Sequence, residues 1–343
     1  PDGYRNKAQY PVGRENGKLK IGFYSRRSHR IVDCRACRLA PPEFERILGI
    51  TAEWIEKYNI SVYDEISKSG ALRHIYLRKA FATGEIMLCL VSAQENLPNT
   101  DALLDALKSE ESIKSVLINI NSDDTNAVLG GRCICLFGDG CITDILCGVK
   151  MRISPLSFYQ VNRTQAERLY KKAAEYAGAE KIKLLLDLYC GAGTISLLLA
   201  QKAKKVIGIE IVPEAIQNAN ENAARNGVKN TEFFCGDASD VAKKLARENL
   251  RPDVITVDPP RKGLAADVVE SIAEMQPGRV VYVSCDSATM ARDVKRLADL
   301  GYTAQRACAV DMFPRADHIE AVCLLTKAVS YTHLRAHETR SNL

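Results

Sequence analysis

From Pro155 onward the chain alternates between helix-like and strand-like segments, and this alternation constrains the fold more than any other feature. The strand-like segments are LLLDLYC, KVIGIEI, TEFFCGDA, DVITVDPP and RVVYVSC. The helix-like stretches are 162–177, 193–203, 213–226, 239–248, 266–274 and 287–299. This pattern predicts an α/β domain at 155–327, with a doubly wound, mainly parallel sheet and helices on both faces. Ligands of such sheets bind beyond the carboxyl ends of the strands.

The first 154 residues follow a different pattern, which predicts mixed α/β structure with antiparallel character. We divide them into a basic β-ribbon at 1–40 and a central mixed α/β domain at 41–154. The ribbon turns at Glu15-Asn16-Gly17, and helical spacing follows from Pro41 to Tyr58. IMLCLVS, SVLININ and RCICLFG look like strands, and we interpret GDG at 138–140 as the turn of a hairpin.

Positive charge is concentrated at the start of the chain. Residues 1–38 contain ten Lys and Arg residues but only three acidic ones, a local charge of +7 in a protein whose net charge is +5. Tyr4, Tyr10, Phe23 and Tyr24 lie among these cations. Cations neutralise phosphates and aromatic rings stack on unpaired bases, so the mixture suits RNA. A solvated face of the ribbon explains the same charges equally well.

The ends of the chain and its cysteines bear on where the protein works. The chain opens at PDGYRNKAQY without Met, as though it began within a longer protein, and we interpret 328–343 as an extraneous tail. No run approaches the roughly 18 uncharged apolar residues that a membrane span needs. Twelve cysteines without a secretory signal predict a cytoplasmic protein with reduced thiols.

The first turn of the alternating region, DLYCGAGTISLLLA, predicts a nucleotide-cofactor site. Gly191 and Gly193 allow a tight turn and a close backbone approach to a ligand at a helix N-terminus. Glu210 ends the next strand, where a carboxylate can accept hydrogen bonds from ribose hydroxyls. Asp237 ends the third strand and can reach an adenine edge. The set favours an adenosine-containing cofactor, either NAD or S-adenosylmethionine, over glycines that serve packing alone.

The fourth strand ends in VDPPRKG, which predicts a second functional turn. The two prolines stiffen the backbone after Asp258 and turn it toward the cleft. Arg261 and Lys262 follow, and they suit a contact with phosphate. A turn without function is the alternative interpretation.

Cys285 is the strongest candidate for a nucleophile. It ends the fifth strand just before a helix, and a helix N-terminus stabilises a thiolate. Glu320 is the one acid of the apolar strand HIEAVCLL, and partial burial near a site would make it a general base. We expect the other cysteines to be inert; these include Cys89, Cys235, Cys308, Cys323 and the series Cys133, Cys135, Cys141 and Cys147.

A thiol, a general base and a sulfonium cofactor fit one reaction, the methylation of uracil at C5. The C5 atom is a poor nucleophile until a thiolate adds at C6 and produces an enolate. C5 then takes a methyl group, a base removes the C5 proton, and the thiol leaves by elimination. The base must be extruded, because C6 is inaccessible within a stack.

Taken in order, the motifs closely resemble those of the RNA uracil-5-methyltransferase family, the 23S rRNA and tRNA 5-methyluridine enzymes. The resemblance rests on GYRNKAQYP, IGFYSRRSHRIVD, SFYQVNRTQAERLY, LLDLYCGAGTISLLLA, VIGIEIVPEAI, VDPPRKG, VSCDSATMARD and MFPRADHIEAV. It implies a Rossmann-like, S-adenosylmethionine-dependent catalytic domain behind an RNA-binding domain. It further implies that Gln160, Tyr189, Glu210 and Asp258 line the cofactor and substrate site. Cys285 would be the nucleophile and Glu320 the base.

The resemblance also implies an iron–sulfur cluster. Many rRNA members carry a [4Fe-4S] cluster on a C-x5-C-x2-C stretch and a fourth cysteine after IVD. Cys37 in IVDCRACRLA matches that last ligand, and Cys34 completes a local CxxC. The upstream trio is missing from this chain, so we expect the longer protein to bind a cluster that this fragment cannot hold properly.

The leading hypothesis is therefore a monomeric, S-adenosylmethionine-dependent methyltransferase that makes 5-methyluridine in 23S rRNA. A tRNA 5-methyluridine enzyme is the nearest alternative, although Cys37 favours rRNA. An NAD-dependent dehydrogenase would leave DPPRKG and SCD unexplained. A non-catalytic RNA-binding protein would account for the basic start but would not require Cys285 with Glu320.

Overall fold

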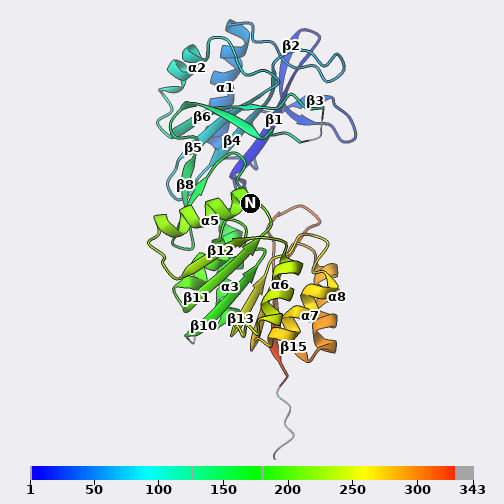
Figure 1. Cartoon of the computed structure of the whole chain (residues 1–343). Coiled ribbons are helices and arrows are strands. Elements are labelled where there is room, and N and C mark those ends of the chain that lie inside the picture. The colour runs from blue at the N-terminus through cyan, green and yellow to red at the C-terminus, as the bar shows by residue number, and fades with distance from the viewer. Residues whose placement is uncertain (1, 125–126, 179–180, 329–343) are drawn as a thin grey trace, which may run out of the picture.

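The computed structural model describes residues 2–124, 127–178 and 181–328, which form two stacked lobes (Figure 1). Each lobe is built on its own β-sheet, and the chain passes from the first lobe to the second once, through a small two-stranded ribbon. The tail that we interpret as extraneous lies, from residue 329 on, outside the described residues.

The first lobe holds a seven-stranded sheet covered by two helices. Its elements are β1 (Lys7–Glu15), β2 (Lys18–Tyr24), β3 (Ile31–Asp33), β4 (Leu72–Lys79), β5 (Ile86–Ser92), β6 (Ile113–Ile120), β7 (Arg132–Phe137), α1 (Pro42–Lys57) and α2 (Thr100–Leu107). The spatial order is β3-β2-β1-β4-β5-β6-β7, so the basic ribbon shares its sheet with the central strands. Both helices bury their apolar side chains in one core with β1, β2, β4, β5 and β6.

The turn predicted between the first two strands is confirmed. β1 and β2 are antiparallel, with Glu15 paired to Lys18. Asn16 and Gly17 between them both have positive φ, the requirement of a two-residue turn that matches the strand twist.

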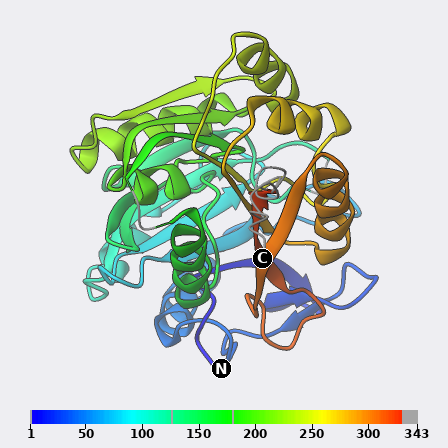
Figure 2. The ribbon, with the colours of Figure 1, turned by 90° about the horizontal axis from the view of Figure 1, so that it is seen from below.

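The second lobe holds the predicted doubly wound sheet. Its elements are β10 (Ile182–Leu188), β11 (Ala203–Glu210), β12 (Thr231–Cys235), β13 (Val254–Val257), β14 (Arg279–Ser284), β15 (Tyr302–Val310), β16 (Glu320–Lys327), α3 (Arg163–Ala177), α4 (Thr194–Ala200), α5 (Pro213–Arg225), α6 (Ala238–Arg247), α7 (Ala266–Met275) and α8 (Ser287–Asp299). The order is β12-β11-β10-β13-β14-β16-β15, parallel as far as β14 and antiparallel at β16 and β15. Two separate cores flank the sheet: one includes α3–α5 and the other α6–α8. Figure 2 shows this lobe from below.

The turn predicted at residues 138–140 is confirmed, but the prediction that its two flanking strands pair as a hairpin is wrong. β7 pairs with β6 in the first sheet, whereas β8 (Ile142–Leu146) pairs with β9 (Val149–Ile153) as a separate ribbon. The GDG turn therefore carries the chain from one sheet to another. Asn222 in α5 and Asn226 at the C-cap of that helix anchor the ribbon. The Asn222 side chain accepts a hydrogen bond from the backbone N–H of Arg152, and the Asn226 side chain accepts one from the backbone N–H of Lys150, both at 2.9 Å.

Among the described residues, no helix combines the length and apolar character that crossing a membrane requires.

Candidate active site

The carboxyl ends of the parallel strands bring the predicted site residues to one edge of the second sheet. Leu188 of β10 pairs with Ile209 of β11 and with Val257 of β13. The next residue of each strand follows at the same level, which brings Tyr189, Glu210 and Asp258 to this edge. This is where a doubly wound sheet binds its ligand.

The glycine turn has the left-handed backbone that its sequence predicted. Gly191 and Gly193 have φ of 54° and 81°, and Gly193 is the N-cap of α4. No atom lies within 4 Å of the place where a Cβ on Gly191 would stand, so the turn is open there. Tyr189 also has positive φ, at 68°, which is rare for a residue with a side chain and marks a strained position beside the turn.

Glu210 is the carboxylate that holds this turn. It accepts hydrogen bonds from the backbone N–H of Gly191 at 3.1 Å, of Ile211 at 2.9 Å and of Val212 at 3.0 Å. A carboxylate offers about four acceptor positions. One position therefore remains for a ligand hydroxyl, and the same side chain fixes the turn against the end of β11.

Apolar side chains exposed next to Glu210 were missed by sequence reasoning. Ile211, Val212 and Phe234 are 58%, 46% and 47% exposed, although large apolar side chains are usually buried. They offer the apolar surface that a flat base needs beside its polar partners. Asp237 follows β12 at the same edge, and its carboxylate caps α6 by accepting the Ser239 N–H at 2.8 Å.

A buried acid that sequence reasoning also missed ties the turn to the sheet. Asp187 accepts hydrogen bonds from Ser196 Oγ at 2.5 Å and from Thr256 Oγ1 at 2.6 Å. Ser196 stands where a dinucleotide fingerprint has its third glycine, so the serine joins α4 to β10. Burial raises the pKa of Asp187 to about 6.

The antiparallel end of the sheet sets Cys285 across from Glu320. Ser284 of β14 pairs with Ala321 of β16, so the neighbouring residues Cys285 and Glu320 face each other across the two strands. Glu320 is only 6% exposed, and burial raises the pKa of its carboxyl. Sequence reasoning chose both residues, but it did not supply this register.

The helix after Cys285 does not hold it as a thiolate. Asp286 caps α8 and accepts the N–H groups of Ala288 and Thr289, both at 3.0 Å, so a carboxylate already occupies the helix N-terminus. Burial raises the pKa of the Cys285 thiol, and the charges of Glu320 and Asp258 raise it further. These surroundings favour the protonated thiol, contrary to our expectation that the helix would stabilise a thiolate.

Asp258 shares the electrostatic environment of this pair. Burial, followed by the charges of Glu320 and Asp187, raises the pKa of Asp258 to about 7. A carboxyl group with this pKa exchanges a proton readily at neutral pH. Arg261 is exposed in the same turn, and its positive charge acts to lower the pKa of both Cys285 and Glu320.

Gln160 reaches the site from outside the parallel sheet. The side-chain amide of Asn6 donates to the Gln160 carbonyl at 2.9 Å, and the Asn6 N–H donates to the Val161 carbonyl at 2.8 Å. Tyr170 of α3 interacts with the Gln160 side chain and with the charges of Asp258 and Glu320, and burial raises its pKa. Tyr170 was not among our predicted site residues, because in sequence it is an ordinary apolar position of an amphipathic helix.

Asp293 fixes the DPPRKG turn against α8. This fully buried carboxylate accepts the Leu264 N–H at 2.7 Å, the Tyr282 hydroxyl at 2.9 Å and Arg292 Nε at 2.9 Å. The turn after Asp258 and the helix after Cys285 are thereby held in one arrangement.

The cysteines of the first lobe do not fit a complete iron–sulfur cluster. Cys34 and Cys37 are half-buried free thiols that interact with each other. A [4Fe-4S] cluster takes four thiolates, and the described residues contain no group of three or more potential ligands. The iron–sulfur cluster therefore remains a prediction that rests on the family resemblance alone.

The site thus combines a glycine turn with a carboxylate, a partly buried thiol and two acids of raised pKa. A thiol beside proton acceptors suits covalent addition to an electron-poor ring. The glycine turn, the Glu210 carboxylate and the exposed apolar side chains suit an adenosine group.

Comparison with known proteins agrees with this geometry. The family model of tRNA (uracil-5-)-methyltransferases matches residues 148–328. An uncharacterized RNA methyltransferase of Clostridium tetani is 46% identical over 327 residues, which cover 95% of this chain and 71% of that protein. A second, from Oceanobacillus iheyensis, is 45% identical over 96% of this chain and 72% of its own length.

A solved structure extends the likeness to three dimensions. The tRNA (uracil-54, C5)-methyltransferase of Pyrococcus abyssi, in complex with S-adenosyl-L-homocysteine, has a TM-score of 0.82 and 31% identity. The likeness covers 95% of this chain and 76% of that one. The chain belongs to the RNA uracil-5-methyltransferase family.

Proposed function

We propose that this protein methylates C5 of an extruded uracil in RNA, with S-adenosylmethionine as methyl donor and Cys285 as covalent nucleophile. The observation that carries the proposal is the register of β14 and β16, which sets Cys285 across from Glu320 at the edge that also holds the glycine turn. A dehydrogenase has no use for this pair, and neither has a protein that only binds RNA.

The residues at the strand ends fit an S-adenosyl group. Gly191 leaves open space, Glu210 retains an acceptor for a ribose hydroxyl, and Ile211 with Val212 offers an apolar surface for adenine. The Pyrococcus abyssi enzyme, solved in complex with S-adenosyl-L-homocysteine, supports the same cofactor. When bound, S-adenosylmethionine supplies an electrophilic methyl group on a sulfonium centre.

The protein's own residues account for the remaining bonds. The Cys285 thiol loses its proton and its sulfur bonds to C6, while the C5=C6 electrons move onto the C4 oxygen. The enolate returns these electrons through C5, which takes the methyl group as the S–CH3 bond breaks and S-adenosylhomocysteine is left as the thioether product. Glu320 then removes the proton on C5, the electron pair re-forms C5=C6, and the C6–S bond breaks to release Cys285.

Asp258 is the acceptor that we propose for the thiol proton. Its pKa of about 7 leaves part of the enzyme with an ionised carboxylate at neutral pH, and its charge is felt at Cys285. Phe158, 77% exposed and two residues before Gln160, is the aromatic ring that we propose to stack on the extruded base.

We propose 23S rRNA as the target, because Cys37 follows IVD as in rRNA members of the family. The Pyrococcus abyssi relative favours tRNA as the second candidate, since that enzyme is named for uracil 54 of tRNA. Mass-spectrometric mapping of 5-methyluridine in both RNAs, from cells with and without the intact gene, separates the two. Loss from 23S rRNA alone supports the proposal, and loss from tRNA alone assigns the second candidate.

A reducing compartment suits the chain, and we propose a cytoplasmic monomer. All twelve cysteines are free thiols, and several lie at or near the surface. Such thiols persist unpaired in the cytosol and not in oxidising compartments.

Glu210→Gln should weaken binding of S-adenosylhomocysteine by about 10- to 100-fold. Hydrogen bonds to a charged group contribute about 1.5–3 kcal/mol, and the amide offers fewer acceptors to the turn and the ribose. Isothermal titration calorimetry measures the change, with Glu214→Gln, an exposed neighbour on α5, as the matched control. The unaltered protein should not bind NAD. If the two variants bind S-adenosylhomocysteine with equal affinity, Glu210 does not contact the cofactor.

Asp258→Asn should lower the pKa of the Cys285 thiol. The substitution removes one of the two negative charges that raise this pKa, so the thiolate should form at lower pH. The rate of iodoacetamide alkylation of the Cys285 peptide, followed by mass spectrometry from mildly acidic to alkaline pH, gives the midpoint. Asp299→Asn at the far end of α8 is the control. A midpoint that stays in place or rises would contradict the electrostatic explanation.

A further inference from the structure

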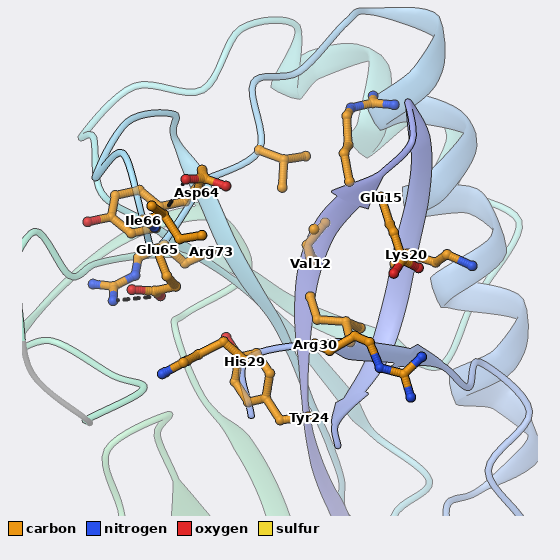
Figure 3. A pocket seen from close by; sticks show the side chains of 15 residues that line it. Val12, Glu15, Lys20, Tyr24, His29, Arg30, Asp64, Glu65, Ile66 and Arg73 are labelled. Carbon is orange, nitrogen blue, oxygen red and sulfur yellow. Dashed lines mark hydrogen bonds and ion pairs between the residues drawn. The ribbon is translucent and has the colours of Figure 1, made fainter. Parts of the chain in front are cut away.

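A cavity of about 280 Å³ lies in the first lobe, apart from the catalytic edge (Figure 3). It is bounded by β1, β2, the β2–β3 hairpin and the segment 62–66. Figure 3 shows Lys20 and Arg30 on one side of it, Ile66 and Arg73 on the other, and Tyr24 with His29 below. The family model matches residues 148–328 only, and the names of the relatives that cover the first lobe as well assign no role to this cavity.

The cations that line the cavity outnumber its acids by one: Arg14, Lys20, Arg30 and Arg73 stand against Glu15, Asp64 and Glu65. Lys20 and Arg30 also belong to a stretch of the chain that carries only positive charge. Residues 16–32 contain five cations and no acid: Lys18, Lys20, Arg26, Arg27 and Arg30. None of the five forms an ion pair with any residue that the structure describes. The surface therefore has free cations for an anionic ligand.

The acids of the cavity are largely engaged already. Glu65 pairs with the buried Arg73 at 3.2 Å and with Lys68 at 3.8 Å. Asp64 accepts the backbone N–H groups of Ile66 and Ser67 at 3.1 and 2.7 Å. Glu15 lies opposite Lys18 across the β1–β2 turn. Asp64 and Glu65 therefore cancel little of the charge offered by Lys20 and Arg30, whereas Glu15, which forms no ion pair with any residue that the structure describes, lies beside Lys20 in Figure 3 and offsets part of its charge.

Aromatic surface accompanies this charge. Tyr24 is 40% exposed, and its ring meets His29 and His74 at 77° and 82°, so neither histidine stacks flat on it. The opposite wall has a buried cation with an unmet hydrogen-bond donor, since Arg73 is 5% exposed and its Nε has no partner in the described structure. A ligand with a flat ring can stack on the exposed face of Tyr24.

We propose that this cavity binds one unpaired nucleotide of the RNA substrate, with the base against Tyr24 and the phosphate at Lys20 and Arg30. The cavity is near the lower end of ligand-pocket volumes, about 300–1,000 Å³, which suits a single nucleotide and excludes a double helix. Stacking also requires an unpaired base. The inference rests on the proposed function for its RNA substrate.

The position of the hairpin agrees with this role. In Figures 1 and 2 the loop between β15 and β16 lies directly below the β2–β3 hairpin, and Glu320 follows that loop. A single strand that leaves the catalytic edge on this side reaches the cavity along the surface. The cavity would hold RNA a few nucleotides away from the reacting uracil.

RNA binding by the full chain tests the cavity. The probe is a fluorescein-labelled, single-stranded RNA of about 16 nucleotides, the upper end of the site sizes of single-strand binding folds, followed by anisotropy. Tyr24→Ala should weaken binding about tenfold, within the range for base–aromatic stacking, and Tyr24→Phe should restore most of it. Arg30→Ala should weaken binding and reduce the slope of log K against the logarithm of the salt concentration by the amount that corresponds to about one phosphate contact. Arg26→Ala, a cation of the same hairpin outside the cavity, is the matched control.

Three results would overturn the proposal: equal affinity for Tyr24→Ala and Tyr24→Phe, equal losses for Arg26→Ala and Arg30→Ala, or crosslinks of 4-thiouridine RNA that avoid residues 18–31. The last measurement uses the unaltered protein and so needs no variant to fold. Methyl transfer separates this proposal from the proposed function. If Tyr24→Ala transfers methyl groups with the same KM for RNA as the unaltered protein, only the proposal for the cavity is contradicted. If the unaltered protein transfers no methyl group to RNA, the proposed function is contradicted.

Discussion

Replacing Cys285 with Ala should reduce methyl transfer to RNA by about 10,000-fold or more, because the nucleophile that makes C5 reactive is lost. The glycine turn joins β10 to α4 and is held by Glu210 at the end of β11, so it does not depend on the Cys285 side chain. Binding of S-adenosylhomocysteine should therefore stay within about twofold of the unaltered protein. Incorporation of a tritiated methyl group into RNA measures the first quantity, and calorimetry measures the second.

The matched control for this change is Cys308→Ala, which removes a half-buried thiol of β15. Cys308 lies in β15 opposite Val322 of β16, two residues along the strand from Glu320, and not at the carboxyl end of a parallel strand. Cys308→Ala should retain methyl transfer. Turnover that survives in Cys285→Ala would show that addition to C6 does not need this sulfur.

Glu320→Gln should trap a covalent complex between the protein and methylated RNA. Gln keeps the size of the buried side chain but cannot remove the C5 proton, so the adduct with Cys285 forms and does not decay. Overall turnover should fall at least about 100-fold, as expected when a general base is removed. The complex appears on a denaturing gel as a protein band of reduced mobility that carries the methyl label.

Two further variants give this experiment its controls. Asp317→Asn changes an exposed acid of the loop before Glu320 and should leave no adduct. The double variant Cys285→Ala with Glu320→Gln should also leave none, because the sulfur that forms the bond is gone. Rapid turnover by Glu320→Gln without any adduct would assign the proton transfer to another residue, of which Asp258 is the next candidate.

The alternation of helix and strand was sufficient to predict the second lobe. Each buried strand is short and apolar, and each is followed by an amphipathic helix, so local pattern and global fold agree. The same alternation placed Gly191, Glu210, Asp258 and Cys285 at strand ends, and therefore at one edge.

Contacts between distant segments could not be predicted in this way. Glu320 faces Cys285 only because β16 is antiparallel to β14, and a shift of one residue would turn Glu320 to the other face. Gln160 is held by Asn6, 154 positions earlier in the chain. Tyr170 reads as a core residue of a helix, because burial and function give it the same amphipathic pattern.

Local sequence also misled us in two places. The spacing of β7 and β8 suggested a hairpin, but each strand found a different partner across the GDG turn. The helix after Cys285 suggested a stabilised thiolate, but Asp286 caps that helix itself. In both cases a neighbour that competes for the same hydrogen bonds decided the outcome.

The covalent bond between Cys285 and C6 of uracil is the central claim, and 5-fluorouridine RNA tests it most directly. After addition and methylation, C5 carries fluorine in place of the proton, so no base can complete the elimination and the adduct accumulates. Tandem mass spectrometry of the digested complex should find the methylated fluorouracil nucleotide on the peptide that contains Cys285. An adduct on any other residue, or methyl transfer to normal RNA with no adduct on fluorinated RNA, would contradict the proposed mechanism.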